Sequence, residues 1–350
     1  MSEETSTLPE ARPRDAVLGP QEETIEEPRR GRSLPSLGGS SRFTGLLLLA
    51  VIISVFAVWI PDTFLRSATA QGIASEQAVT LVVAVGLLAN LAAGQFDLSV
   101  AGNLGLTSLL VATLMVYDHM APGLAVAIGL AAGTAIGVVN GVLVAVIGVN
   151  SFIATLGMSS VLLAITEQIS GDQFVGPLPS SFVSLTGHSL AGVPEIAIYA
   201  LIVAVVVWWA LEHTPWGRRV YGTGAGPDAA KLAGVRTGRY VFGTFVISGF
   251  VAGLAGVLLA SQLGDLSPTL GPPYLLPVFA ACFLGTTQVK PGRFNVWGTV
   301  LAIILLAVGE KGLQLADGGA LWVTDLFNGV ALIGAVSVAV LSARWRRSNT

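Results

Sequence analysis

One acidic residue lies inside an otherwise apolar region and is the first candidate for chemistry. The stretch GQFDLSVAGN, residues 94–103, places Asp97 between two apolar segments, with Ser99 and Asn103 close behind. An acid near membrane depth is costly unless it has a partner or faces water, so it marks a candidate site. The same spacing suits a helix cap, in which Asp97 or Ser99 accepts the free N–H groups that begin a helix. Both interpretations, pathway contact and cap, stay open.

A second polar stretch begins an apolar helix. In NSFIATLGMSS, residues 150–160, Asn150 or Ser151 is expected to cap the helix, and Phe152, Thr155 and Ser159 follow at helical spacing. Such a mixed face suits either a water-lined pathway or hydrogen bonds between helices.

A long basic loop carries the third candidate. Residues 212–239 read EHTPWGRRVYGTGAGPDAAKLAGVRTGR, with a turn-rich middle and a short helical stretch, PDAAKLAGV. Asp228 sits in the first turn of that stretch, where an acid stabilises a helix. The stretch is either an ordinary surface element or a docking lever for another protein.

Catalytic and metal-binding patterns are missing from the sequence. No phosphate-binding loop of the form GxxxxGK[ST] occurs. The segment GTTQVKPG lacks both the spacing of this loop and the Ser or Thr that follows its Lys. His119, His188 and His213 are far apart and have no metal-ligand spacing. The single cysteine, Cys282, reads as a buried apolar side chain. We therefore expect no enzyme activity, no metal and no cofactor, and a formal net charge of −3 gives no basic field for nucleic acid.

The composition indicates a membrane protein. The chain has 350 residues, of which 53% are hydrophobic and 11% charged, whereas soluble domains average about 25% charged residues. Because about 20 apolar residues cross a bilayer, we predict an all-α polytopic protein of about ten transmembrane helices. The expected spans are 44–60, 73–94, 99–117, 122–148, 151–170, 194–211, 240–263, 273–288, 294–312 and 320–342. Several are short, notably 273–288, so a broken helix is among the options.

The positive charges favour one orientation of these ten spans. With both termini in the cytoplasm, ten of the twelve Lys and Arg residues beyond the N-terminal tail lie on the cytoplasmic side, and Arg66 and Lys311 are the exceptions. The ten are Arg218, Arg219, Lys231, Arg236, Arg239, Lys290, Arg293, Arg344, Arg346 and Arg347.

The chain divides into a tail, a membrane domain and a short basic end. Residues 1–42 mix Glu, Pro, Ser, Gly and Arg without periodicity and are expected to be disordered. Residues 43–343 form the membrane domain, and 344–350 a basic cytoplasmic tail. Within the domain, small residues recur on one helix face, which predicts close helix packing. They are Gly129, Gly133, Gly137 and Gly141, with Gly249, Gly253 and Gly256 in a later span.

The basic loop resembles the cytoplasmic signature of the permease subunits of ribose-type ABC importers. The matching residues are Thr214, Gly217, Arg218, Gly224, Ala229, Ala230, Gly234 and Val235. Other family elements follow in the expected order: GQFDLSV, SFIATLG and ISGFVAGLAGVLLASQL. The resemblance runs from about residue 70 to 340.

The resemblance implies a non-catalytic permease in a bacterial plasma membrane. It would import a small polar solute, a monosaccharide, delivered by an extracytoplasmic binding protein and driven by cytoplasmic ATP-binding cassette subunits. A second permease chain, identical or different, would complete the pathway within the lipid. Residues 214–235 would dock on the ATPase. Asp97, Ser99, Asn103, Phe152, Thr155 and Tyr274 would lie near the pathway.

The sequence also departs from the family pattern. Leu275 replaces the usual Glu after Tyr274, GTTQ at 285–288 replaces Gly-Gly-Thr-Ser, and Gly226 replaces an Asn. A branched-chain amino acid permease of the same fold therefore remains an alternative. An ion-coupled carrier is a further alternative. It predicts buried pairs of ionisable side chains, which Asp97, Glu310, Lys311 or Asp325 would have to form. A membrane scaffold that transports nothing is the third.

Overall fold

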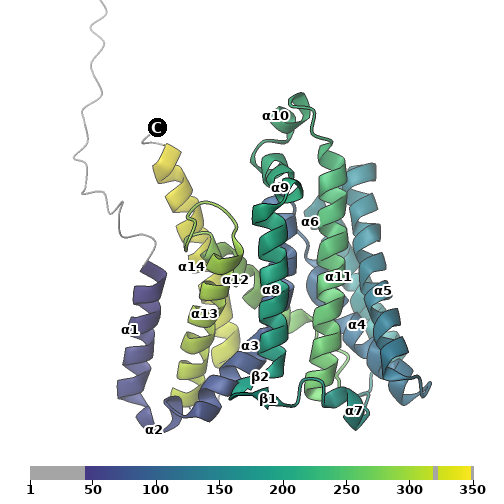
Figure 1. The fold of residues 1–350 in the computed structure, drawn as a ribbon, viewed down its shortest axis with the longest axis vertical. Coiled ribbons are helices and arrows are strands. Elements are labelled where there is room, and N and C mark those ends of the chain that lie inside the picture. The colour runs from purple at the N-terminus through teal and green to yellow at the C-terminus, as the bar shows by residue number, and fades with distance from the viewer. Residues whose placement is uncertain (1–43, 318–321, 348–350) are drawn as a thin grey trace, which may run out of the picture. The chain divides into compact units, whose positions relative to one another are not determined.

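The computed structural model describes residues 44–317 and 322–347, and Figure 1 shows its helical architecture. The tail predicted at residues 1–42 lies outside the described residues, as do residues 348–350 at the other end of the chain. The described chain is mostly helical. Turns and loops join the helices, and one loop contains a short hairpin in which β1 (Ser189–Leu190) pairs antiparallel with β2 (Val193–Pro194).

Seven helices in the described part of the chain are long and apolar enough to cross a membrane. They are α3 (Ser67–Ala92), α4 (Ser99–Val116), α5 (Pro122–Gly141) continued by the π-helix η1 (Val142–Ile147), α6 (Ser151–Ser170), α8 (Glu195–His213), α11 (Thr237–Leu263) and α13 (Val296–Ala316). Three further helices are apolar over shorter lengths: α1 (Thr44–Trp59), α12 (Leu275–Gly285) preceded by the 3₁₀-helix η2 (Pro272–Tyr274), and α14 (Trp322–Arg347). Each expected span falls on one of these ten helices, which confirms an all-α polytopic membrane protein.

The remaining helices are short and lie at the two ends of the long ones. In Figure 1, α9 (Pro215–Ala225) and α10 (Pro227–Leu232) lie at the upper end, whereas α2 (Pro61–Phe64) and α7 (Ser180–Val183) lie at the lower end with the hairpin. Proline is the first residue of α2, α9 and α10. Its fixed φ suits a helix start, where its missing N–H costs nothing.

Close packing of α5 on α11 holds the centre together. A Cβ on Gly249 would lie 2.7 Å from the Cα of Gly137, and one on Gly133 would lie 2.9 Å from the Cα of Gly253. Only glycine fits at such distances, so the predicted role of these glycines in helix packing is confirmed. Helix α11 also packs against α3 and α4, and with them encloses the main apolar core. Cys282 is buried in that core, as expected.

The segment between α11 and α12 returns into the helix layer. Its Gly271 meets the first turns of α4, where a Cβ would overlap the carbonyl oxygen of Ala101 and lie 3.3 Å from the Cα of Gly105. Helix α12 then covers only 11 residues. The span expected at 273–288 is therefore a short helix preceded by an irregular segment.

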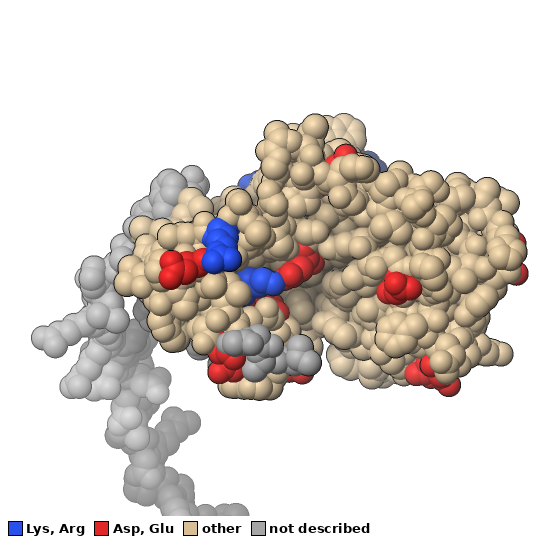
Figure 2. All heavy atoms as spheres, turned by 90° about the horizontal axis from the view of Figure 1, so that it is seen from below, with Lys and Arg blue, Asp and Glu red and all other residues tan. Residues whose placement is uncertain are grey.

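The two ends of the helices carry opposite charge. We call the end with α9 and α10 the basic end; its described charged residues are Arg218, Arg219, Lys231, Arg236, Arg239, Lys290 and Arg293, with Glu212 and Asp228. At the opposite, acidic end are Asp62, Glu76, Asp118, Glu167, Asp172, Glu195, Asp265, Glu310, Asp317 and Asp325, with Arg66 and Lys311. Figure 2 views this end from below and shows acidic atoms spread over the face.

Candidate functional site

Asp97 is buried in the turn between α3 and α4, with 2% of its surface exposed. Its carboxylate accepts hydrogen bonds from Ser99 Oγ at 2.6 Å, Ser99 N at 3.1 Å, Asn90 Nδ2 at 3.0 Å and Ser248 Oγ at 3.0 Å. None of the ion pairs among the described residues includes it. A buried acid needs such donors in place of water. The N-cap residue of α4 is Leu98, which makes no side-chain cap, so neither Asp97 nor Ser99 is the N-cap that the sequence suggested.

Ser99 and Asn103 continue this network into the helix layer. Asn140 Nδ2 on α5 donates to Ser99 Oγ at 2.7 Å. Asn103 Nδ2 donates to the carbonyl oxygens of Gly133 and Gly249, both at 3.1 Å. Both residues are buried, so they bind helices together rather than face an open space. Asn90, Asn140 and Ser248 were missed by the sequence reading, although each is a lone polar residue within an apolar run.

The start of α6 is joined to the α3–α4 turn. Asn150 caps α6 through its side-chain oxygen, which accepts from Phe152 N at 3.0 Å. Ser151 Oγ accepts from Phe96 N at 3.2 Å, and Thr155 Oγ1 accepts from Leu98 N at 3.0 Å. The sequence left two roles open for this stretch, hydrogen bonding between helices or lining a pathway. Thr155 makes a hydrogen bond to another element, whereas Phe152 is 49% exposed.

The basic loop forms a compact helical projection. Thr214 caps α9, because its Oγ1 accepts from Gly217 N at 3.2 Å, and α10 covers most of the helical stretch expected there. A Cβ on Gly217 would overlap the carbonyl oxygen of Leu211. Arg218 and Ala229 are exposed, and Ala230 is buried. Gly234 follows α10 with a φ of +79°, a conformation that glycine adopts without strain.

Tyr221 anchors α9 to the loop before α13. Its hydroxyl donates to Phe294 O at 2.7 Å, and the Arg293 guanidinium lies 3.5 Å from its ring centre. Burial raises the pKa of the Tyr221 phenol, against the opposing effect of Arg293. The phenol therefore stays protonated and keeps its donor role at neutral pH.

A cavity of about 680 Å³ lies where these elements meet. The α3–α4 turn, the segment from η1 into α6, and the α9–α10 region each contribute to its wall. Its lining residues include Gln95, Phe96, Asn150, Ser151, Phe152, Thr223, Gly224, Lys231 and Thr237. Of the residues predicted near a pathway, Phe152 alone lines this cavity, while Asp97, Ser99, Asn103 and Thr155 stand behind its wall.

A smaller cavity of about 220 Å³ lies between α4, α6 and the irregular segment before α12. Its wall contains Ser159, Ser160 and Thr166 from α6, opposite Gly102 of α4 and Pro272. Tyr274 is half-buried nearby in η2 and lines neither cavity. The sequence pattern indicated a polar face at Ser159 and allowed a broken helix at 273–288, but not that the two lie side by side.

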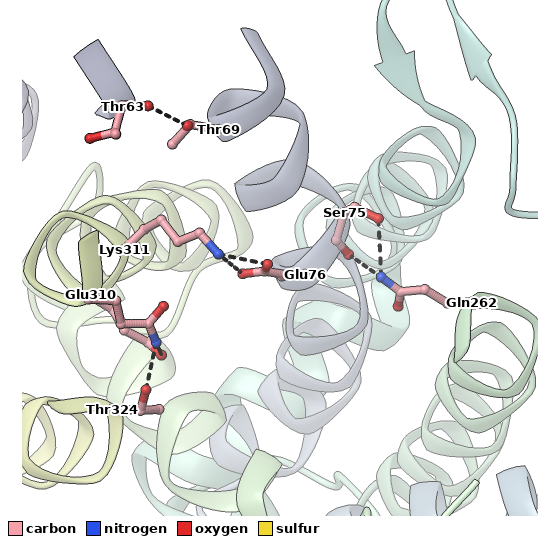
Figure 3. Close-up of polar contacts among 9 residues, drawn as sticks. Thr63, Thr69, Ser75, Glu76, Gln262, Glu310, Lys311 and Thr324 are labelled. Atoms are coloured by element: carbon pink, nitrogen blue, oxygen red, sulfur yellow. Dashed lines mark hydrogen bonds and ion pairs between the residues drawn. The ribbon is translucent and has the colours of Figure 1, made fainter. Parts of the chain in front are cut away.

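The acidic end has a polar cluster of its own, shown in Figure 3. Lys311 Nζ lies 2.8 and 3.0 Å from the Glu76 carboxylate oxygens, joining α13 to α3. Gln262 on α11 donates to Ser75 O and Oγ, each at 3.1 Å. Gln314 donates to Glu310 and Thr324, which ties α13 to α14. Glu76 was not among the candidates from the sequence.

No group of three or more His, Cys, Asp or Glu side chains lies close enough to hold a metal ion in the described residues. His213 meets the Trp208 ring edge-on, and His188 Nδ1 lies 3.8 Å from Glu195. The histidines are therefore scattered, as their spacing indicated.

Comparison with known proteins gives consistent results. Residues 69–336 match the family model of the branched-chain amino acid transport system / permease component. The chain is 31% identical over 275 residues to the ribose import permease protein of Bacillus subtilis, covering 78% of this chain and 84% of that protein. It is 29% identical over 300 residues to the D-allose transport system permease protein of Escherichia coli, covering 85% and 90%. The fructose import permease protein of Rhizobium meliloti is 30% identical over 302 residues, covering 84% and 83%. No solved structure matches the chain.

Proposed function

Within the family described as branched-chain amino acid transport system / permease component, to which the chain belongs, we propose that it is the membrane subunit of an ATP-driven monosaccharide importer. One observation carries the proposal. The 680 Å³ cavity at the basic end is walled jointly by the two polar stretches and by the basic loop that resembles a coupling element. A space for solute and a surface for a driving partner are therefore parts of one structure.

The cavity wall suits a neutral polar solute. Amide and hydroxyl groups of Gln95, Asn150, Thr223 and Thr237 alternate with the rings of Phe96 and Phe152. Lys231 is its one charged residue, and that ammonium pairs with Asp228 at 3.3 Å. A zwitterionic amino acid needs a negative partner for its ammonium group, and the described lining contains no Asp or Glu. A sugar needs only hydrogen bonds and an apolar surface. The relatives named for ribose, allose and fructose support the same choice.

The charge of the two ends supports an orientation. If the basic end faces the cytoplasm, the described Lys and Arg residues follow the positive-inside rule except Arg66 and Lys311. Arg344, Arg346 and Arg347 at the end of α14 agree with this choice. The proposal is ten crossings, α12 being the shortest, with both termini inside.

The projection formed by α9 and α10 is the proposed docking surface for the ATPase subunits. Its exposed Arg218 is free to meet an acidic partner, and glycines hold the projection against the membrane helices. The proposed coupling residues are Thr214, Gly217, Arg218, Gly224, Ala229, Ala230 and Gly234.

The proposed pathway begins at Phe152 and the cavity around it. Asp97, Ser99, Asn103 and Thr155 are proposed to shape the wall from behind, and Tyr274 to act on the outer side near η2. The exposed face of α6 also carries Gly157 and Ser160. A second permease chain laid against this face would close the pathway.

An extracytoplasmic binding protein is the proposed source of solute, and its docking surface is the acidic end. A partner that binds there must present Lys or Arg residues, since like charges across an interface cost free energy.

Reconstitution tests the function. The chain, partner ATPase subunits and a binding protein are placed in liposomes, and uptake of radiolabelled D-ribose, D-allose and D-fructose is followed with and without ATP. ATP-dependent uptake of one of these sugars is expected. Uptake by the isolated chain on a sodium or proton gradient would contradict the proposal and favour an ion-coupled carrier.

A further inference from the structure

The proposed coupling helix α9 and helix α6 both contact the α3–α4 turn, residues 93–98. On one side of the turn, a Cβ on Gly224 of α9 would overlap Ala92 O and lie 2.9 Å from Gly94 N. Gly94 itself has a φ of +75°. Backbone meets backbone here, so a displacement of α9 cannot be absorbed by side-chain rotation.

On the other side, the turn holds α6 by two hydrogen bonds. The N–H groups of Phe96 and Leu98 donate to the hydroxyls of Ser151 and Thr155, and both hydroxyl residues are buried. Both bonds are partly buried, and an N–H group shielded from water needs an acceptor, since an unpaired donor is costly. The two bonds therefore fix the inner end of α6 to the turn.

The other attachments of α6 at this end are looser. The chain enters α6 from η1 through Gly148, whose φ is +86° and which has open space where a Cβ would stand. Along its length α6 packs mainly against α4, and its opposite face is exposed at Phe152, Ile153, Leu156 and Val161. Helix α6 can therefore shift about its inner end if the turn moves.

The turn itself is held in one shape by Asp97. Asn90 at the end of α3, Ser99 at the start of α4 and Ser248 on α11 all donate to this carboxylate. These bonds tie the turn to the ends of α3 and α4 and to α11, so residues 93–98 keep their shape when α9 presses on them.

From these contacts we propose that residues 93–98 form a rigid relay that carries displacement of the coupling helix α9 to α6 and so reshapes the cavity between them. Ser151 and Thr155 act as positioning residues for α6 rather than as solute contacts. The inference rests on the proposed function, because it assumes an ATPase that moves α9.

Thr155 and Thr166 give a matched pair of variants. Both are buried threonines on α6, and each hydroxyl donates to a carbonyl oxygen four residues earlier. Among the described contacts Thr155 alone also accepts a bond from another element, from Leu98 N. Thr155→Val and Thr166→Val therefore make the same change in the same helix and differ in the relay bond.

The readout is the reactivity of a cysteine placed at the cavity wall by Phe152→Cys, in the full complex with its ATPase subunits. The native Cys282 is buried, so we expect it to be protected from a maleimide. We expect ATP to change the labelling rate at least fivefold when Thr155 is present. Thr155→Val should abolish most of this change while leaving basal ATP hydrolysis intact, whereas Thr166→Val and Thr155→Ser should keep it.

Equal responses of the Thr155→Val and Thr166→Val complexes would overturn the relay. If Thr155→Val does not assemble, Ser151→Ala removes the second bond, and a response equal to that of the parent Phe152→Cys complex would overturn the proposal instead. A parent complex that hydrolyses ATP and imports sugar without any change in labelling also contradicts the relay. Absence of ATP-dependent uptake in the unmodified complex contradicts the proposed function itself.

Discussion

The two ends of the helices are joined by different kinds of contact. At the basic end, glycine backbones meet carbonyl groups directly, as at Gly217 with Leu211 and Gly224 with Ala92. Side chains bridge elements at both ends, as Lys290 and Glu212 do at the basic end and Lys311 and Glu76 do at the acidic end in Figure 3. At the acidic end, however, long side chains make the polar link between α3 and α13. Backbone contacts transmit displacement without loss, whereas long side chains have many rotamers and adjust. The difference fits the proposal that a partner drives the basic end, whereas the acidic end adjusts.

The largest expected effect tests the backbone contacts of α9. Gly217→Ala places a methyl group against the Leu211 carbonyl oxygen, and overpacking of this kind costs about 1–3 kcal/mol. We expect ATP-driven sugar uptake by the reconstituted complex to fall tenfold or more, since the docking helix must shift.

Gly222→Ala is the matched control, because it lies on the same helix and has open space at its Cβ position. Alanine favours a helix over glycine by about 1 kcal/mol, so uptake should be unchanged and the melting temperature equal or higher. If both variants lose uptake equally, the contact with Leu211 does not explain the loss, and the interpretation is wrong.

Next in size is the effect of Asp97. Asp97→Asn replaces a carboxylate that accepts four hydrogen bonds with an amide whose NH₂ group faces donors. Buried polar mismatches cost about 1–3 kcal/mol, so we expect a clear fall in the melting temperature of the detergent-solubilised protein. The same substitution at exposed Asp265, at the acidic end, should leave it unchanged. Similar melting curves for the two variants would remove Asp97 as the centre of the network.

A charge at the docking surface should have a moderate effect. Arg218→Glu reverses an exposed charge on α9, and we expect affinity for the ATPase subunits, measured by co-purification at graded concentrations, to fall about tenfold. Arg66→Glu makes the same change at the acidic end and serves as the control. Weaker ATPase binding by the Arg66→Glu variant would contradict the assignment of the two faces.

The positions of the helices and of the basic loop could be predicted from the sequence, but which face of each helix meets protein could not. Apolar runs of about 20 residues mark a membrane helix whether its side chains meet lipid or protein. Thr155 and Phe152 therefore looked alike as neighbours of a pathway, although Thr155 is buried and Phe152 is exposed. The glycine stripe on α5 was interpretable because only close packing explains a repeat of the smallest residue.

Long-range partners were equally out of reach. Ser248 donates to Asp97 across 151 residues, and Asn103 reaches Gly249 across 146. The order of residues along the chain does not say which helix lies beside which. The polar character of each residue could be read in advance, and its partner required the fold.

The smallest expected effect concerns one exposed ion pair at each end. Lys311 and Glu76 are 23% and 55% exposed, and Lys231 and Asp228 at the basic end are 61% and 92% exposed. Because water screens exposed pairs, the Lys311–Glu76 pair should contribute only about 0–1 kcal/mol to stability, and the Lys231–Asp228 pair nothing measurable. Double-mutant cycles of unfolding in detergent, with Glu76→Gln and Lys311→Met against Asp228→Asn and Lys231→Met, measure both. A coupling energy above about 2 kcal/mol for the Lys311–Glu76 pair would exceed the range for exposed pairs. The acidic end would then be held as firmly as the basic end, and the contrast between adjustable and rigid ends would fail.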